Sequence, residues 1–106
     1  MYLIKIVRRY FAVRSTEREL RSLAFAIREH QEFRSQLVIN CAMVEAHVAT
    51  FGYIHADGER LQKLRAAISM IDVALADLRK QFDEASALLK QLLAEGQAEY
   101  AVPSIV

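Results

Sequence analysis

The chain has very little of the residues that interrupt helices. Its 106 residues include three Gly and one Pro, and residues 1–51 contain neither type. Gly costs roughly 1 kcal/mol and Pro roughly 3 kcal/mol in a helix interior, so their scarcity favours long helices. A hydrophobic content of 54% with 25% charged residues argues against general disorder. We predict a single all-α domain over residues 1–106.

The chain also lacks cysteine pairs and long apolar runs. Cys41 is the single cysteine, which excludes a disulfide within the chain. Its apolar neighbourhood is typical of a small buried residue in a reducing compartment. No run approaches the roughly 20 apolar residues of a membrane-spanning helix, and the charged start Met1–Arg9 does not resemble a secretory signal. These absences predict a cytoplasmic protein.

Motifs of catalysis and cofactor binding are missing as well. The sequence contains no Gly-rich phosphate loop and no Gly-x-Ser-x-Gly. It also lacks the Glu-x-x-His motif of helical di-metal sites. His55 and Asp57 lie close together in the sequence, but no cysteine pattern supports a zinc site there. We therefore predict a non-enzyme that holds no cofactor and no metal.

The most regular feature present is a row of apolar residues in the second half of the chain. Its steps alternate three and four without interruption, as in the a/d seam of a coiled coil. This second seam row consists of Leu61, Leu64, Ile68, Ile71, Leu75, Leu78, Phe82, Ala85, Leu89 and Leu92. It predicts a helix over residues 59–95, with Asp57 as N-cap and Gly96 as its stop.

An equivalent row precedes it. The first seam row consists of Leu20, Leu23, Ile27, His30, Arg34, Leu37, Cys41, Val44, Val48 and Phe51. Thr16 and Glu19 have the spacing of a capping box, which predicts a helix over residues 16–51, although the same box fits inside one continuous helix. Gly52 follows the last position of the row, where a left-handed residue commonly ends a helix.

Residues 52–58 form a short turn in this interpretation, and residues 96–106 form a tail. A short connection makes two helices antiparallel neighbours, so we predict a long antiparallel helical hairpin. Near the turn both helices are apolar beyond their seam rows, and a helix that is apolar on all sides is normally buried. We therefore predict that two hairpins dimerise into a four-helix bundle. The residues expected in the core or the dimer interface are Leu37, Cys41, Val44, Val48, Ile68, Ile71 and Leu75.

His30 and Arg34 occupy seam positions where aliphatic residues are expected. A charge at such a position is costly unless it is paired. Folding the hairpin about Ala56 makes an Arg34–Asp77 or a His30–Asp83 contact available. We interpret these four residues as a polar layer that fixes the register of the helices. A ligand site, or side chains that extend outward to solvent, are the alternatives.

Residues 1–14 form a basic amphipathic segment that we predict to be helical. Its apolar side is expected to pack on the rest of the fold and contains Leu3, Ile6, Val7 and Tyr10. Residues 1–36 carry eight Lys and Arg against four Glu, so the basic character extends beyond the segment. The predicted partner-binding residues are Arg8, Arg9, Arg14, Arg18 and Arg21.

Two rigid helices without catalytic motifs predict a protein–protein interaction module of the adaptor, small chaperone or inhibitor type. Such a module acts by stoichiometric binding to a protein partner. The expected partners are a second copy of the chain and an unidentified protein. The alternatives use the same basic segment: a nucleic-acid-binding protein, or a peripheral protein at a membrane surface.

Overall fold

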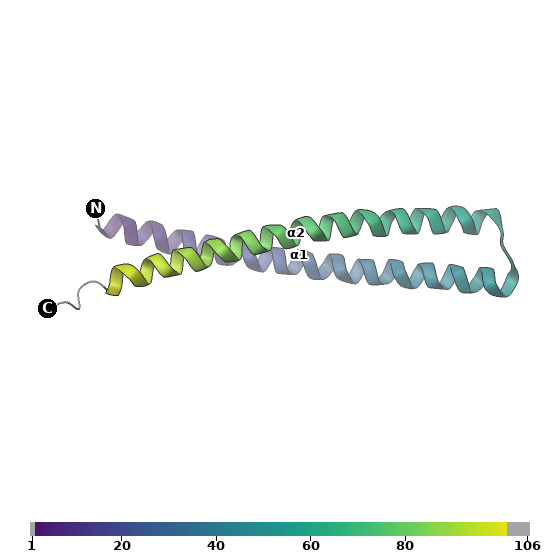
Figure 1. Cartoon of the computed structure of the whole chain (residues 1–106), viewed down its shortest axis with the longest axis horizontal. Helices are drawn as coiled ribbons and strands as arrows, with labels where there is room; N and C mark the ends of the chain where they lie inside the picture. The colour runs from purple at the N-terminus through teal and green to yellow at the C-terminus, as the bar shows by residue number, and fades with distance from the viewer. Residues whose placement is uncertain (1, 102–106) are drawn as a thin grey trace. The chain divides into compact units, whose positions relative to one another are not determined.

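The computed structural model describes residues 2–101 and the side chains of residues 2–98. It contains helix α1 (Tyr2–Phe51) and helix α2 (His55–Ala101), joined by residues 52–54. The helices pack against each other (Figure 1), and residues 2–101 contain no strand. The predicted all-α antiparallel helical hairpin is confirmed.

The first helix begins earlier than predicted. It runs without a break from Tyr2, so residues 2–14 are the first turns of α1. The hydroxyl of Thr16 donates to the carbonyl oxygen of Ala12 at 2.7 Å, and Thr16 is 5% exposed. A hydroxyl bonded to the carbonyl four residues earlier is typical of a helix interior. The prediction of a helix start at residue 16 is therefore wrong.

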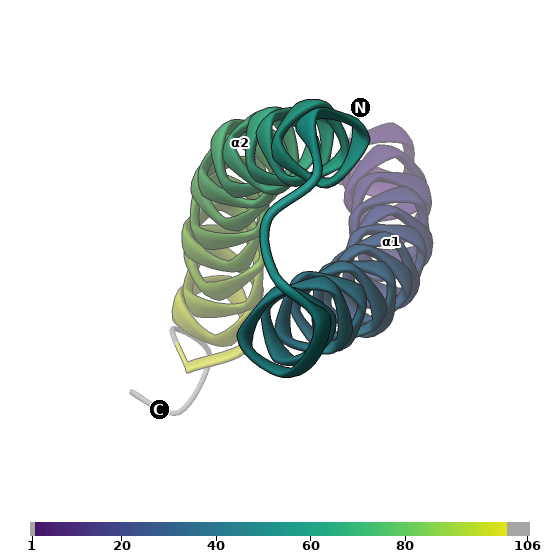
Figure 2. The ribbon, with the colours of Figure 1, turned by 90° about the vertical axis from the view of Figure 1, so that its right-hand side faces the viewer.

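The turn is shorter than the predicted range of residues 52–58. Gly52 has a φ of 92°, and its N–H donates to the carbonyl of Val48 at 2.9 Å, which confirms Gly52 as the left-handed end of α1. Figure 2, viewed from the turn, shows the connection crossing from α1 to α2. The carbonyl of Ile54 accepts from the N–H of Asp57 at 2.9 Å. Asp57 therefore lies inside the first turn of α2 and is not its N-cap. Its carboxylate still interacts favourably with the helix dipole.

Gly96 does not end α2, which corrects the prediction of a tail over residues 96–106. The helix continues to Ala101, and residues 102–106 lie outside the described part of the chain. A Cβ built at Gly96 would lie 3.5 Å from Cδ of Arg9. The aliphatic part of the Arg9 side chain thus lies close to α2 at Gly96.

The contacts of the chain divide it into two compact units. Unit 1 comprises Met1–Phe25 with Arg79–Val106, and unit 2 comprises Ala26–Leu78. In unit 2 the core contains buried Leu37, Ile71 and Leu75, and the residues packed against them are Ile27, Leu64, Ala67 and Ile68. Among the side chains of unit 1 that the structure describes, Thr16, Leu23 and Ala85 are buried. Each unit therefore takes its buried side chains from both helices.

The two seam rows account for this burial. All ten positions of the second row are buried or half-buried, as are nine of the ten in the first, with Phe51 the exception at 74% exposed. The first row also continues towards the N-terminus in steps of four and three. These further positions, all buried or half-buried, are Thr16, Val13, Arg9 and Ile6. This continuation explains why α1 has no break near residue 15.

The apolar side predicted for residues 1–14 is mostly not packed. Ile6 is half-buried, but Leu3, Val7 and Tyr10 are exposed. The prediction that this side packs on the rest of the fold is therefore wrong for three of its four residues. The half-buried positions here follow the extended first seam row, which leaves the large apolar residues between them facing outward.

Candidate functional site

Arg34 forms an ion pair across the two helices of unit 2. Its Nε lies 2.6 Å from Oδ1 of Asp72, and its second terminal nitrogen lies 3.5 Å from Oδ2. The hydrogen bond and the charge of Asp72 raise the pKa of Arg34 above its ordinary value. The predicted partner was Asp77, so the prediction is wrong in register. Its cause is the turn, because a connection of three residues in place of seven changes which residues face each other.

His30 also differs from the prediction. Its Nδ1 donates to the carbonyl oxygen of Ala26 at 2.7 Å, so its polar contact is with its own helix. The expected partner, Asp83, is exposed and belongs to unit 1, whereas His30 belongs to unit 2. Asp77 is exposed as well. The side-chain contact that Arg34 makes across the two helices is its ion pair with Asp72.

A second ion pair lies nearer the turn. Arg65 contacts Glu45 at 3.2 Å, and both side chains are exposed. Successive residues are rotated by about 100° around a helix, which places Glu45 and Arg34 on the same flank of α1, and Arg65 and Asp72 on the same flank of α2. We call this flank of unit 2 the ion-pair side.

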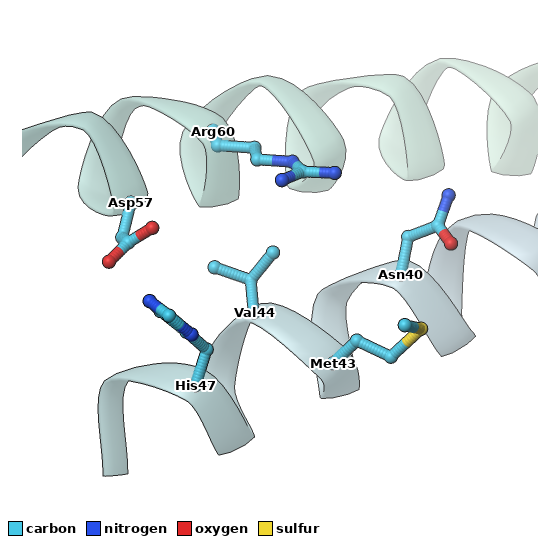
Figure 3. Close-up of a pocket in the computed structure, with 6 residues that line it drawn as sticks. All are labelled: Asn40, Met43, Val44, His47, Asp57 and Arg60. Atoms are coloured by element: carbon cyan, nitrogen blue, oxygen red, sulfur yellow. The ribbon is translucent and has the colours of Figure 1, made fainter. Parts of the chain in front are cut away.

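A cavity of about 290 Å³ opens on the opposite side of unit 2. Its lining residues, drawn in Figure 3, are Asn40, Met43, Val44 and His47 from α1 and Asp57 and Arg60 from α2. Met70, one of the most exposed apolar residues of unit 2, lies on this same flank of α2 by the rotation of about 100° per residue. We call this flank the methionine side.

His47 and Asp57 point towards one another across the cavity, whereas Arg60 extends along α2 (Figure 3). The imidazole of His47 packs on the ring of Phe51, with centroids 4.9 Å apart. Oδ2 of Asp57 is buried and has no hydrogen-bond partner among the described residues, which leaves it able to accept a hydrogen bond from a group that enters the cavity. The cavity is thus a small polar notch within an apolar surface.

The sequence analysis assigned Asp57 to the turn and did not predict that it lines one cavity with His47. The signal was present in their positions around the turn. His47 lies four residues before the end of α1, and Asp57 lies two residues after the start of α2. Because only three residues join the two helix ends, these positions must lie near each other. This proximity can be inferred only when the bounds of both helices are known.

The predicted basic residues are placed differently from one another. Arg8, Arg14, Arg18 and Arg21 are exposed, whereas Arg9 is half-buried at a seam position. Arg14, Arg18 and Arg21 follow steps of four and three, so they share one face of α1. The structure therefore groups three of the five predicted arginines on one exposed face.

The residues predicted for the core or the dimer interface all lie between α1 and α2 of unit 2. Five are buried, namely Leu37, Cys41, Val44, Ile71 and Leu75, and two are half-buried, namely Val48 and Ile68. They are therefore already covered within one chain.

Two properties of the described residues bear on the class of site. Among these side chains no three His, Cys, Asp or Glu lie together as metal ligands. No described helix has a stretch that is both long and apolar enough to cross a membrane. The chain matches no protein-family model, no curated protein and no solved structure.

Proposed function

We propose that the chain is a non-enzymatic protein-binding module that acts as a homodimer, with the methionine side of unit 2 as its binding surface. The observation that carries this proposal is the number of large apolar side chains left on the surface. In unit 2 the exposed ones are Phe33, Val38, Ile39, Met43, Phe51, Tyr53, Ile54, Met70 and Val73. They are spread over more than one flank of unit 2, and those on the methionine side, Met43 and Met70 among them, are the ones that we expect a partner to cover.

The two flanks of unit 2 suggest which surface is used. The ion-pair side carries two charged contacts, Arg34–Asp72 and Glu45–Arg65. The methionine side carries Met43 at 64% exposed and Met70 at 73% exposed. Methionine is flexible and polarizable, which suits apolar binding surfaces that adapt to their partner. We place the binding of protein on this side.

Sedimentation equilibrium of matched variants tests the dimer. Met43→Glu with Met70→Glu adds two charges to the methionine side, and we expect it to convert a dimer into a monomer with unchanged helix content by circular dichroism. The control, Val38→Glu with Ala76→Glu, adds two charges at exposed positions of the other flank and keeps the dimer. A wild-type monomer at micromolar concentration, or a dimer that survives the first variant, contradicts the proposal.

Affinity capture from the native host tests the protein partner. We expect the wild-type chain and the control variant to recover the same protein in stoichiometric amount, and the methionine-side variant to lose it. Binding of nucleic acid that falls steeply as salt rises, without recovery of any protein, would support the nucleic-acid alternative in its place.

We also propose a cytoplasmic location. It is supported by Cys41, which is a free and buried thiol, as is usual for proteins of reducing compartments. Labelling of Cys41 in denatured protein taken from intact cells tests the thiol state, and a blocked thiol would contradict this location.

A further inference from the structure

The outer face of α1 in unit 1 carries a regular row of exposed residues. Its steps of three and four match those of the seam row, but it lies about 160° away around the helix. This outer row consists of Ile4, Val7, Phe11, Arg14, Arg18, Arg21 and Phe25, and every member is exposed. Three apolar residues are thus followed by three arginines on one continuous face.

Further apolar side chains widen the first part of the outer row. Leu3 is 72% exposed and Phe11 is 64% exposed. Tyr2 and Tyr10 are exposed beside them, and the Tyr10 and Phe11 rings contact each other with centroids 5.7 Å apart. The first three turns of α1 therefore present a cluster of aliphatic and aromatic side chains to solvent.

The charged members of the outer row are all arginines. Glu17 and Glu19 are the acidic residues of this part of α1. Glu19 lies about 100° or more around the helix from Arg14, Arg18 and Arg21, whereas the half-buried Glu17 lies beside the row, three residues after Arg14 and four before Arg21. Helix α2 packs against the opposite side of α1, at seam positions such as Val13 and Leu20. The outer row consequently carries positive charge with no acidic side chain among its own residues.

From this arrangement we infer that the outer row attaches the chain to an anionic lipid surface. This inference is independent of the proposed protein-binding function, which uses unit 2. Apolar and aromatic side chains of an interfacial helix enter the boundary between headgroups and acyl chains, and basic side chains contact the lipid phosphates. The apolar side chains that insert are those of Ile4, Val7 and Phe11. The basic side chains that contact the phosphates are those of Arg14, Arg18 and Arg21.

The outer row suits an anionic lipid surface better than it suits nucleic acid. Nucleic acid would use the arginines but leave the exposed apolar cluster in water. From Ile4 to Phe25 the row spans about 32 Å along one convex helix. A planar, deformable surface contacts such a row without a matching groove. Since no described helix crosses a membrane, the attachment is peripheral.

Vesicle co-sedimentation of the full chain tests the inference. We expect binding to vesicles of phosphatidylcholine with phosphatidylserine, and weak binding to phosphatidylcholine alone. Replacing Arg14, Arg18 and Arg21 with Gln should lower the partition coefficient about fivefold for each arginine. Val7→Ser with Phe11→Ser should lower it at least about tenfold. All variants should keep the wild-type circular dichroism spectrum.

Matched controls separate the effect of the row on vesicle binding from the effects of overall charge and overall apolar content. Lys63→Gln, Lys80→Gln and Lys90→Gln together remove the same charge from exposed positions of α2, outside the row. Phe33→Ser with Leu88→Ser removes two exposed apolar side chains elsewhere. Both controls should bind anionic vesicles within about twofold of wild type.

A spectroscopic test reports insertion directly, because the chain contains no Trp. In Phe11→Trp, the emission should shift to shorter wavelength on adding anionic vesicles and be quenched by brominated lipids, while Phe33→Trp should show neither effect. Equal binding to both vesicle types, binding that survives the row variants, or binding to duplex DNA but not to vesicles would each overturn the inference.

Discussion

Nε of Arg34 and Oδ1 of Asp72 lie 2.6 Å apart, and the two residues are equally far from the turn. Arg34 is 17 residues before Phe51, the last residue of α1, and Asp72 is 17 residues after His55, the first residue of α2. In an antiparallel hairpin, residues that face each other across the two helices lie at about equal distances from the turn. The pair therefore marks the register that the short turn imposes on unit 2.

Removing this ion pair should not unfold the protein. Both side chains are about half exposed, and pairs of this kind contribute little to stability because water screens them. We expect Arg34→Leu to keep the wild-type helix content and a urea midpoint equal to or above that of wild type. A clear fall in the midpoint would show that Arg34 has a larger structural role than its contacts with Asp72.

The protonation of Arg34 should not make the stability of the protein depend on pH near neutrality. Its pKa is raised above the ordinary value, so the stabilisation is present below the pKa of the unfolded chain and is lost only as pH rises through the higher pKa of the folded chain. The difference in urea midpoint between Arg34→Leu and wild type, whatever its sign, should therefore be the same at neutral and at mildly alkaline pH. Asp72→Asn, compared at the same pH values, is the matched control for the acidic partner.

Truncation of the unit 2 core should be costly. Leu75 is 3% exposed and packs in the cluster with Leu37 and Ile71. We expect Leu75→Ala to lower the free energy of unfolding by about 2–5 kcal/mol. Gln62→Ala and Lys90→Ala, at exposed positions of the same helix, should change it by no more than about 0.5 kcal/mol. Equal losses in urea unfolding at both kinds of position would mean that the seam is wrongly placed.

Gly52 should be sensitive to any side chain. Its φ of 92° is in the left-handed region, where a Cβ costs roughly 1–2 kcal/mol. No heavy atom lies within 4 Å of the Cβ position, so the cost of Gly52→Ala should be conformational and not steric. Gly52→Asn should lose less, because Asn tolerates this conformation. Thermal unfolding of the two variants measures the difference.

Gly96 should respond in the opposite direction. It lies inside α2, and an added Cβ would make an ordinary contact at 3.5 Å with Cδ of Arg9. Ala is favoured over Gly in a helix interior by roughly 1 kcal/mol, so we expect Gly96→Ala to raise the unfolding temperature. A lower unfolding temperature would show that α2 needs the flexibility of glycine at this point.

A substitution at Thr16 distinguishes a buried position inside a helix from a helix N-cap. Its hydroxyl donates to the carbonyl of Ala12, a contact that contributes little to helix stability. We expect Thr16→Val to change the free energy of unfolding by less than about 0.5 kcal/mol, or to raise it, since the side chain is buried at a seam position. If Thr16 capped a separate helix, the same change would cost about 1 kcal/mol. Chemical denaturation distinguishes these results.

Much of the fold follows from the sequence by itself. The scarcity of Gly and Pro determined that the chain is helical, and the steps of three and four determined which side of each helix is buried. All ten positions from Leu61 to Leu92 behave as that spacing requires. Gly52 also followed from the sequence, because an end of a helix in the left-handed conformation favours glycine. These are local properties of spacing and backbone conformation.

The contacts between helices were decided only by the tertiary structure. A capping box such as Thr16 with Glu19 has the same sequence at a helix start and in a helix interior, and packing of Ile6 and Val13 selected the interior. The exact turn length set the register, which replaced Asp77 with Asp72 as the partner of Arg34 and brought His47 opposite Asp57. Sequence periodicity gives the buried face of each helix, whereas the position of one helix along the other depends on the closure of the chain.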